Sequence, residues 1–142
     1  MAKILVAFWS GTGNTEKMAE LIRDGAVEKG AEVECRSVSG LDAEAALAYD
    51  VIALGSPSMG QEVIEEGEVE PLVEALSGKL KDRKVALFGS YGWGDGEWMR
   101  NWAGRMRGYG AVLLDDGLAV HETPDGDSAD QCKAFGAKLA AF

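Results

Sequence analysis

Small hydroxyl and amide side chains, spaced by glycine, fill the segment that follows the first apolar run of the chain. Residues 10–15 read Ser-Gly-Thr-Gly-Asn-Thr, between the apolar residues 3–7 and a segment with apolar residues at helical spacing. Two glycines allow a tight turn that points successive N–H groups inward, and a helix start adds unpaired N–H groups. Ser10, Thr12, Asn14 and Thr15 add side-chain donors. The segment therefore predicts an anion pocket, and the expected anion is a phosphate.

The same segment excludes two common nucleotide-binding loops. It contains no lysine, which the nucleoside-triphosphate loop requires before its hydroxyl residue. Gly11 and Gly13 begin a dinucleotide fingerprint, but Glu16 stands where the third glycine would be. Neutral side chains suit one phosphomonoester bound by hydrogen bonds. The alternative is a tight turn between strand and helix that binds nothing.

Two further glycine-rich segments each carry one large apolar residue. Met59 lies in residues 55–62, and Trp93 lies in residues 89–96 with Tyr91 nearby. An exposed methionine and tryptophan on opposite sides of a cleft would enclose a flat aromatic ring. Trp93, between two glycines, is off any apolar face, so we expect it at a ligand. Trp98 and Trp102 fall on an apolar helical stripe and are expected in the core, whereas Trp9 suits either role.

The elements that must position these segments alternate along the chain. Strands are predicted at residues 3–7, 32–37, 51–54 and 84–88, with a fifth at 111–114 and 118–121 bent at Gly117. Helices are predicted after residue 15 to near Gly30, over 42–48 with an Asp42 cap, from near Pro71, from residue 98 to Gly108 or Gly110, and after residue 127. This alternation predicts an α/β protein with a five-stranded parallel sheet covered on both faces. The three unusual segments follow strands one, three and four, so we expect them at one sheet edge, lining one site.

Composition limits the classes of function. The 142 residues predict a single domain, and the net charge of −10 disfavours nucleic acid and anionic membranes as partners. It favours a basic partner protein or high solubility. Cys35 and Cys132 are expected to be free thiols, and a single histidine, His121, leaves no basis for a multi-histidine metal site. No secretory signal or membrane span is seen, so a cytoplasmic location is expected.

Together these residues give a resemblance that runs nearly from end to end. The sequence resembles the flavodoxins, in particular the short-chain type of anaerobic bacteria. The motifs are Trp-Ser-Gly-Thr-Gly-Asn-Thr-Glu at 9–16, Met59-Gly60 with Glu62, and Leu-Phe-Gly-Ser-Tyr-Gly-Trp-Gly-Asp-Gly at 87–96. The fifth strand carries no insertion, as in the short-chain members. The resemblance implies a three-layer sandwich with strand order 2-1-3-4-5, formed by residues 1–142 as one FMN-binding domain.

It also implies a function and a set of site residues. The expected protein is a low-potential one-electron carrier with non-covalent FMN and no catalytic residues or metal. It would work mainly between the semiquinone and hydroquinone forms, as a monomer, and pass electrons between redox enzymes in place of ferredoxin. The implied FMN-binding residues are Ser10, Gly11, Thr12, Gly13, Asn14, Thr15, Ser56, Pro57, Ser58, Met59, Gly60, Gln61, Glu62, Gly89, Ser90, Tyr91, Gly92, Trp93 and Gly94.

The resemblance assigns roles within this set. Residues 10–15 would hold the phosphate, Met59 and Trp93 would cover the two faces of the ring, and Glu62 would accept a hydrogen bond from the ring N3–H. The Gly60–Gln61 peptide would face N5 and turn over on reduction, which glycine permits. Gln61 and Pro57 depart from the residues common among relatives, so the turn and one phosphate contact could differ here. The glutamates at 65–70 are either a solvated helix face or charges that oppose the second electron.

Two other functions remain open from the sequence. An FMN-dependent oxidoreductase, such as a quinone or azo reductase on the same fold, would turn over NAD(P)H, but no spare length is seen for a substrate pocket. A non-redox module would bind phosphate or a protein partner through the same loops, yet it would have no need of Met59 and Trp93 beside a cleft.

Overall fold

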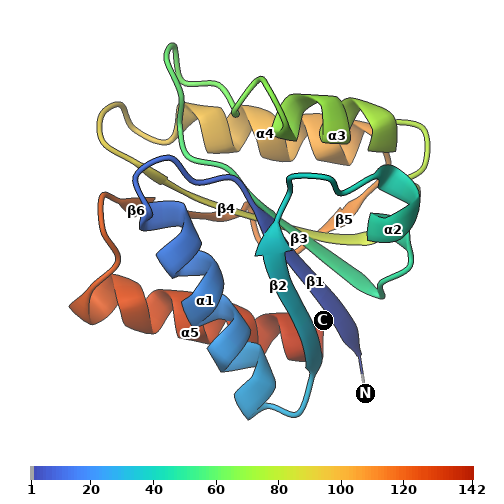
Figure 1. The fold of residues 1–142 in the computed structure, drawn as a ribbon, viewed down its shortest axis with the longest axis horizontal. Coiled ribbons are helices and arrows are strands. Elements are labelled where there is room, and N and C mark those ends of the chain that lie inside the picture. The colour runs from blue at the N-terminus through green and yellow to red at the C-terminus, as the bar shows by residue number, and fades with distance from the viewer. Residues whose placement is uncertain (1) are drawn as a thin grey trace.

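A six-stranded parallel sheet forms the centre of the molecule in the computed structural model, which describes residues 2–142 (Figure 1). The strands are β1 (Lys3–Phe8), β2 (Glu32–Ser37), β3 (Val51–Gly55), β4 (Lys84–Tyr91), β5 (Val112–Leu113) and β6 (Leu118–His121). Their order is β2-β1-β3-β4-β5, and β6 also pairs with β4. The predicted fold class and strand order are therefore confirmed.

The predicted fifth strand is two short strands that pair with β4 one after the other. Leu113 of β5 lies beside Val85, and Leu118 of β6 lies beside Phe88. The chain between them leaves the sheet, with positive φ at Asp115 (54°) and Gly117 (90°). The bend thus falls at the predicted glycine, but it interrupts the strand. Pairing with β6 also extends β4 to Tyr91, into residues predicted as loop.

Helices cover both faces of the sheet (Figure 1). On one face lie α1 (Asn14–Glu28) and α5 (Gly126–Ala141); on the other lie α2 (Ala43–Leu47), α3 (Val69–Leu76) and α4 (Glu97–Gly108). Successive side chains of β1 point to opposite faces of the sheet. Ile4 and Val6 pack with α1 and α5, whereas Leu5 and Ala7 pack with the helices on the other face. Because strands buried on both faces need apolar side chains throughout, β1 and β3 read as continuous apolar runs.

Two helix starts predicted from single residues are confirmed. The Asp42 cap is confirmed, since its carboxylate accepts a hydrogen bond from the Ala45 N–H at 2.8 Å. The prediction that α3 starts near Pro71 is confirmed, because α3 begins two residues earlier, at Val69. Pro71 is tolerated there because the first-turn N–H groups have no partner within the helix.

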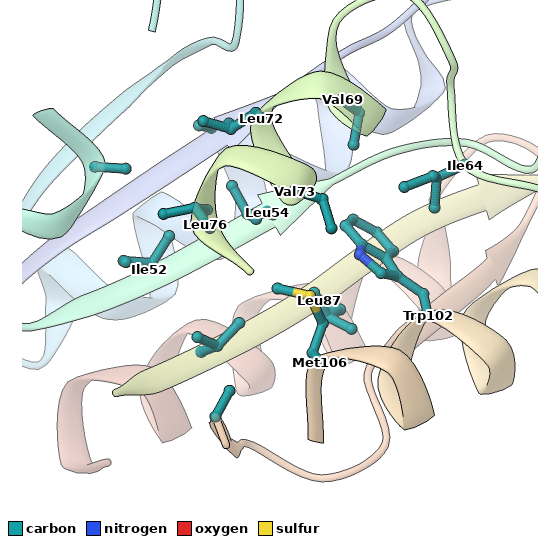
Figure 2. Packing of buried hydrophobic residues seen from close by; sticks show 14 of the residues in the cluster. Ile52, Leu54, Ile64, Val69, Leu72, Val73, Leu76, Leu87, Trp102 and Met106 are labelled. Atoms are coloured by element: carbon teal, nitrogen blue, oxygen red, sulfur yellow. The ribbon is translucent and has the colours of Figure 1, made fainter. Parts of the chain in front are cut away.

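The core on the α3–α4 side packs the two helices against β3 and β4. Figure 2 shows Val69, Leu72, Val73 and Leu76 from α3 and Trp102 and Met106 from α4 around Leu54 and Leu87. Trp98 and Trp102 are 1% and 2% exposed, so the prediction that both belong to the core is confirmed. Within residues 2–142, no helix is long and apolar enough to cross a membrane.

Candidate functional site

The segment after β1 presents unpaired backbone donors, as expected of an anion pocket. Ser10 Oγ accepts hydrogen bonds from the N–H groups of Gly13 (3.1 Å) and Glu16 (3.3 Å), which fixes the turn. Gly13 adopts a φ of 96°, a conformation that favours glycine. Within the described residues, the N–H groups of Gly11, Thr12, Asn14 and Thr15 have no hydrogen-bond acceptor. These donors and the positive end of α1 can hold a phosphate without a lysine or arginine.

Two side chains of this segment connect it to the rest of the site. The Thr15 hydroxyl is buried and lies 3.2 Å from the Ser90 hydroxyl on β4. Asn14 Oδ1 accepts a hydrogen bond from the Thr123 hydroxyl at 2.8 Å. The side chain of Thr15 is therefore engaged within the fold, while the Asn14 amide nitrogen and the Ser10 hydroxyl proton are free to donate to a ligand.

The predicted convergence of three loops at one sheet edge is confirmed. A cavity of about 270 Å³ lies where β1, β3 and β4 end, as expected for parallel strands. Its lining combines apolar side chains with hydroxyl and backbone groups: Trp9, Gly11, Thr12, Asn14, Pro57, Ser58, Met59, Ser90, Tyr91, Gly92 and Glu122. The other predicted site residues do not line this cavity: Ser10, Gly13, Thr15, Ser56, Gly60, Gln61, Glu62, Gly89, Trp93 and Gly94.

Met59 begins a tight turn whose ends are hydrogen-bonded to each other. The Met59 N–H donates to the Val63 carbonyl at 2.8 Å, and the Val63 N–H donates back at 3.1 Å. Positive φ occurs at Gly60 (46°) and Glu62 (55°), and not at Gln61. In this conformation Gln61 therefore needs no left-handed backbone, and the unusual backbone is borne by its two neighbours.

Two buried oxygens of this segment have no partner among the described residues: Ser58 Oγ and Glu62 Oε1. Ser58 lines the cavity, and Glu62 lies against the third loop, where a Cβ on Gly94 would come within 2.2 Å of Glu62 Oε1. Buried polar atoms are normally hydrogen-bonded, so each is suited to a ligand group. Together with the phosphate donors and the apolar wall, these atoms fit a phosphorylated ligand with an aromatic ring bearing N–H groups.

The aromatic residues of the third loop are distributed between core and surface. Tyr91 lines the cavity, with its ring centroid 5.4 Å from that of Trp98 and 5.2 Å from that of His121. Trp93 is 57% exposed, so it does not join Trp98 in the core. Its exposed ring does not line the cavity itself.

Glu122 lines the cavity and was missed by the sequence analysis. It follows β6 and adopts a φ of 60°, which is uncommon for a residue other than glycine. Its N–H donates to the Tyr91 carbonyl at 2.8 Å. No local sequence signal marks this position, because only the pairing of β6 with β4 brings it to the site. Trp9, left open above, both lines the cavity and packs against the core.

The acidic residues after Met59 are not one solvated face. The Glu65 carboxylate is buried and accepts backbone N–H groups at the start of α3, and Glu70 pairs with Arg105 of α4. The Arg105 guanidinium holds the pKa of the Glu70 carboxyl below its ordinary value. Glu66 and Glu68 are exposed. Only part of the acidic segment therefore acts as free surface charge.

The sheet order and the donor-rich loops define an α/β protein that binds a phosphorylated aromatic cofactor at the carboxyl ends of its strands. The profile of the flavodoxin family matches residues 6–136. The chain is 50% identical to a flavodoxin of Clostridium beijerinckii, a match covering 95% of this chain and 97% of that protein. It is 44% identical to a flavodoxin of Megasphaera elsdenii, over 95% and 96% of the two chains. The solution structure of the two-electron reduced Megasphaera elsdenii flavodoxin superposes with a TM-score of 0.89 at 43% identity, over 98% of this chain and 99% of that one.

The chain therefore belongs to the flavodoxin family. It is an electron-transfer protein with non-covalently bound FMN, and it is not an enzyme. It passes electrons to redox partner proteins. These conclusions confirm the family, the cofactor and the type of function predicted from the sequence motifs.

Proposed function

We propose that the chain is a low-potential carrier that passes single electrons between redox enzymes in place of ferredoxin, with FMN bound across the three loops. The observation that carries this proposal is the set of unpaired groups on the three loops: the free N–H groups of the first loop and Ser58 Oγ at the cavity, and Glu62 Oε1 against the third loop. Bound FMN supplies a ring that takes up and returns electrons one at a time. The cofactor-binding residues we assign are those predicted from the sequence, with Glu122 added as a cavity residue.

Each group of residues has a distinct part in this proposal. The free N–H groups of Gly11, Thr12, Asn14 and Thr15 and the Ser10 hydroxyl hold the phosphate through hydrogen bonds. Met59 and Trp93 exclude water from the faces of the ring, and the free Glu62 oxygen accepts its N3–H. The Gly60–Gln61 peptide faces N5, where glycine permits either orientation of the peptide. Because no cationic side chain lies in the phosphate loop, the negative charge added on full reduction is poorly compensated, which lowers the second potential.

The partner proteins in this proposal present basic surfaces to an acidic carrier. The net charge of −10 supports partners with basic surfaces, because opposite charges attract as the two proteins approach. We further propose that residues 1–142 act as one domain and as a monomer in the cytoplasm. Large exposed apolar side chains are few and scattered among the described residues, and two of the four, Val63 and Trp93, flank the site. Cys35 and Cys132 are free thiols, as in proteins of reducing compartments.

An anaerobic reductive titration of the FMN-loaded protein tests this function. We expect two separate one-electron steps, the second at a much lower potential than the first. Glu62→Gln should raise the Kd for FMN about tenfold or more, because the hydrogen-bond acceptor for the ring N3–H loses its charge. Glu66→Gln is the matched control, since it removes one exposed charge from the same segment and should leave the Kd nearly unchanged. A single two-electron step in the wild type would instead favour the two-electron reductases considered above.

A further inference from the structure

The loop that carries Met59 is closed twice by hydrogen bonds. At its base, the Glu65 N–H donates to Ser56 Oγ at 2.9 Å, and the Ser56 N–H donates to the Phe88 carbonyl on β4 at 3.0 Å. Nearer the tip lies the pair of bonds between Met59 and Val63. The position of the turn at residues 60–62 therefore depends on where the two ends of the loop, Ser56 and Glu65, are held.

The Glu65 end is held by its own carboxylate. Glu65 is only 8% exposed, and its Oε2 accepts a hydrogen bond from the Gly67 N–H at 2.7 Å. Its Oε1 accepts the N–H groups of Glu68 at 2.7 Å and Val69 at 2.9 Å. These N–H groups at the start of α3 have no partner within the helix, and the helix dipole favours a negative charge at this place.

The helix that receives this carboxylate is itself firmly placed. Val69, Leu72, Val73 and Leu76 of α3 point into the core between the sheet and α4 (Figure 2). Ile64, the residue before Glu65, packs in the same cluster and is 6% exposed. The carboxylate thus ties the far end of the loop to a rigid element.

We propose that Glu65 is a positioning residue for electron transfer: its carboxylate fixes the loop of residues 56–65 on the start of α3 and so sets the place of Met59 and Glu62 against the cofactor. The inference rests on the proposed function, in which this loop faces FMN. Glu65 lies outside the cavity lining, so it acts through the loop and not by contact.

Positioning must be separated from two simpler effects, loss of charge and loss of a helix cap. Glu66→Gln removes the same charge at the next, exposed residue, where no hydrogen bond to the helix is lost. Asp42→Ala removes the cap of α2, a helix away from the cavity. The two variants are the charge control and the cap control for Glu65→Gln.

The first measurement uses the protein without FMN. Amide hydrogen exchange in the apoprotein reports the Met59 and Val63 N–H groups, both of which are hydrogen-bonded in the turn. Glu65→Gln should accelerate their exchange about tenfold relative to wild type, since local opening of the loop becomes easier. Asp42→Ala and Glu66→Gln should leave the exchange of these two amides unchanged.

The second measurement is FMN affinity and the two one-electron potentials of the loaded protein. Glu65→Gln should raise the Kd about tenfold and shift both potentials, whereas Glu66→Gln should leave the Kd nearly unchanged. Gly67→Ala is a second variant that keeps the carboxylate: its Cβ would lie 2.8 Å from Glu65 Oε2, so it should displace the side chain and change exchange and Kd in the same direction.

The inference is overturned if Glu65→Gln and Gly67→Ala lower stability as Asp42→Ala does, with turn exchange and Kd as in the wild type. If Glu65→Gln does not fold, Gly67→Ala alone tests the proposal, which is overturned if that variant has wild-type turn exchange and Kd. Failure of the proposed function has a different signature, because the wild-type protein itself would then not bind FMN or would not show two one-electron steps.

Discussion

At the scale of single residues, the ion pair between Glu70 and Arg105 joins the start of α3 to α4 beneath the cofactor loop. The Arg105 guanidinium donates to both carboxylate oxygens of Glu70, with 2.7 Å for Nη1 to Oε1, and its Nε donates to the Tyr109 hydroxyl at 2.8 Å. The side chains of Arg105 and Glu70 are 30% and 29% exposed. Such a two-point, partly buried pair contributes more than an ordinary surface ion pair.

This pair should make part of the stability dependent on pH. Hydrogen bonding from Arg105 lowers the pKa of Glu70 in the folded state, so the folded protein binds fewer protons there than the unfolded chain. Its stabilisation is present above the ordinary carboxyl pKa and is lost as the pH falls through the lowered value. Glu70→Gln should therefore reduce the free energy of unfolding by about 1 kcal/mol at neutral pH.

Urea denaturation of the apoprotein, wild type beside Glu70→Gln, measures this difference across pH. The gap between the two proteins should narrow as the pH falls below about 4, where carboxylates become protonated. Glu68→Gln, at an exposed position, is the control and should show little difference at either pH. A gap for Glu70→Gln that stays constant down to low pH would mean that the ion pair contributes no net stability.

Residue types at the site could be predicted from the sequence better than their contacts. The donors at residues 10–15 follow from local chemistry, because a glycine-rich turn before a helix exposes N–H groups whatever surrounds it. The pairing of Thr15 with Ser90 and the arrival of Glu122 at the cavity depend on strands far apart in the sequence. Local patterns carry no information on such contacts, so the Thr15–Ser90 contact and the position of Glu122 could be found only in the structure.

At the scale of elements, α1 and α5 approach each other closely through one glycine on each helix. A Cβ on Gly136 would lie 2.0 Å from the Ile22 carbonyl oxygen, and a Cβ on Gly25 would lie 2.0 Å from the Lys133 carbonyl oxygen. Both contacts are with backbone, which cannot rotate away as a flexible side chain could. The spacing of this helix pair, which covers one whole face of the sheet, therefore depends on glycine at both positions.

Gly136→Ala should push the two helices apart and destabilise the protein by roughly 2–3 kcal/mol, as overpacking does in other cores. Gly104→Ala in α4 is the matched control. Gly104 is also a helical glycine, but a Cβ there would meet nothing within 4 Å. That variant should gain about 0.5–1 kcal/mol from the better helix propensity of alanine. Equal effects of the two substitutions on urea unfolding would contradict the packing argument.

Element boundaries were predictable where the signal is local and unpredictable where it is tertiary. The Asp42 cap acts within one turn of its own helix, and its prediction is confirmed. The start of α3, predicted near Pro71, lies at Val69, whose N–H donates to the carboxylate of Glu65 four residues earlier. The last residues of β4 are strand because β6 pairs with them. This pairing has no signature in the segment of β4 itself.

At the scale of the whole molecule, the charge acts on every approaching partner. Of the charged residues, 24 are acidic and 14 are basic, and several of the basic ones are paired on the surface, such as Arg100 with Asp95 and Arg107 with Asp116. Paired charges cancel at a distance, so the field reflects the excess of carboxylates. Such a field steers cations toward the protein and slows the approach of anions, and salt screens both effects.

The rate of electron transfer should therefore depend on ionic strength with a sign set by the partner's charge. For the FMN-loaded, reduced protein, the second-order rate with a small cationic one-electron oxidant should fall as salt increases. The rate with an anionic oxidant of similar size should rise, because repulsion is screened. Stopped-flow measurement with both oxidants over about 10 to 300 mM salt, a range in which the Debye length falls from ~30 Å to below 8 Å, separates the field from other salt effects. If the two rates changed in the same direction, steering by net charge would be excluded, and the choice of basic partners would have to come from local contacts around Trp93 and the cofactor loop.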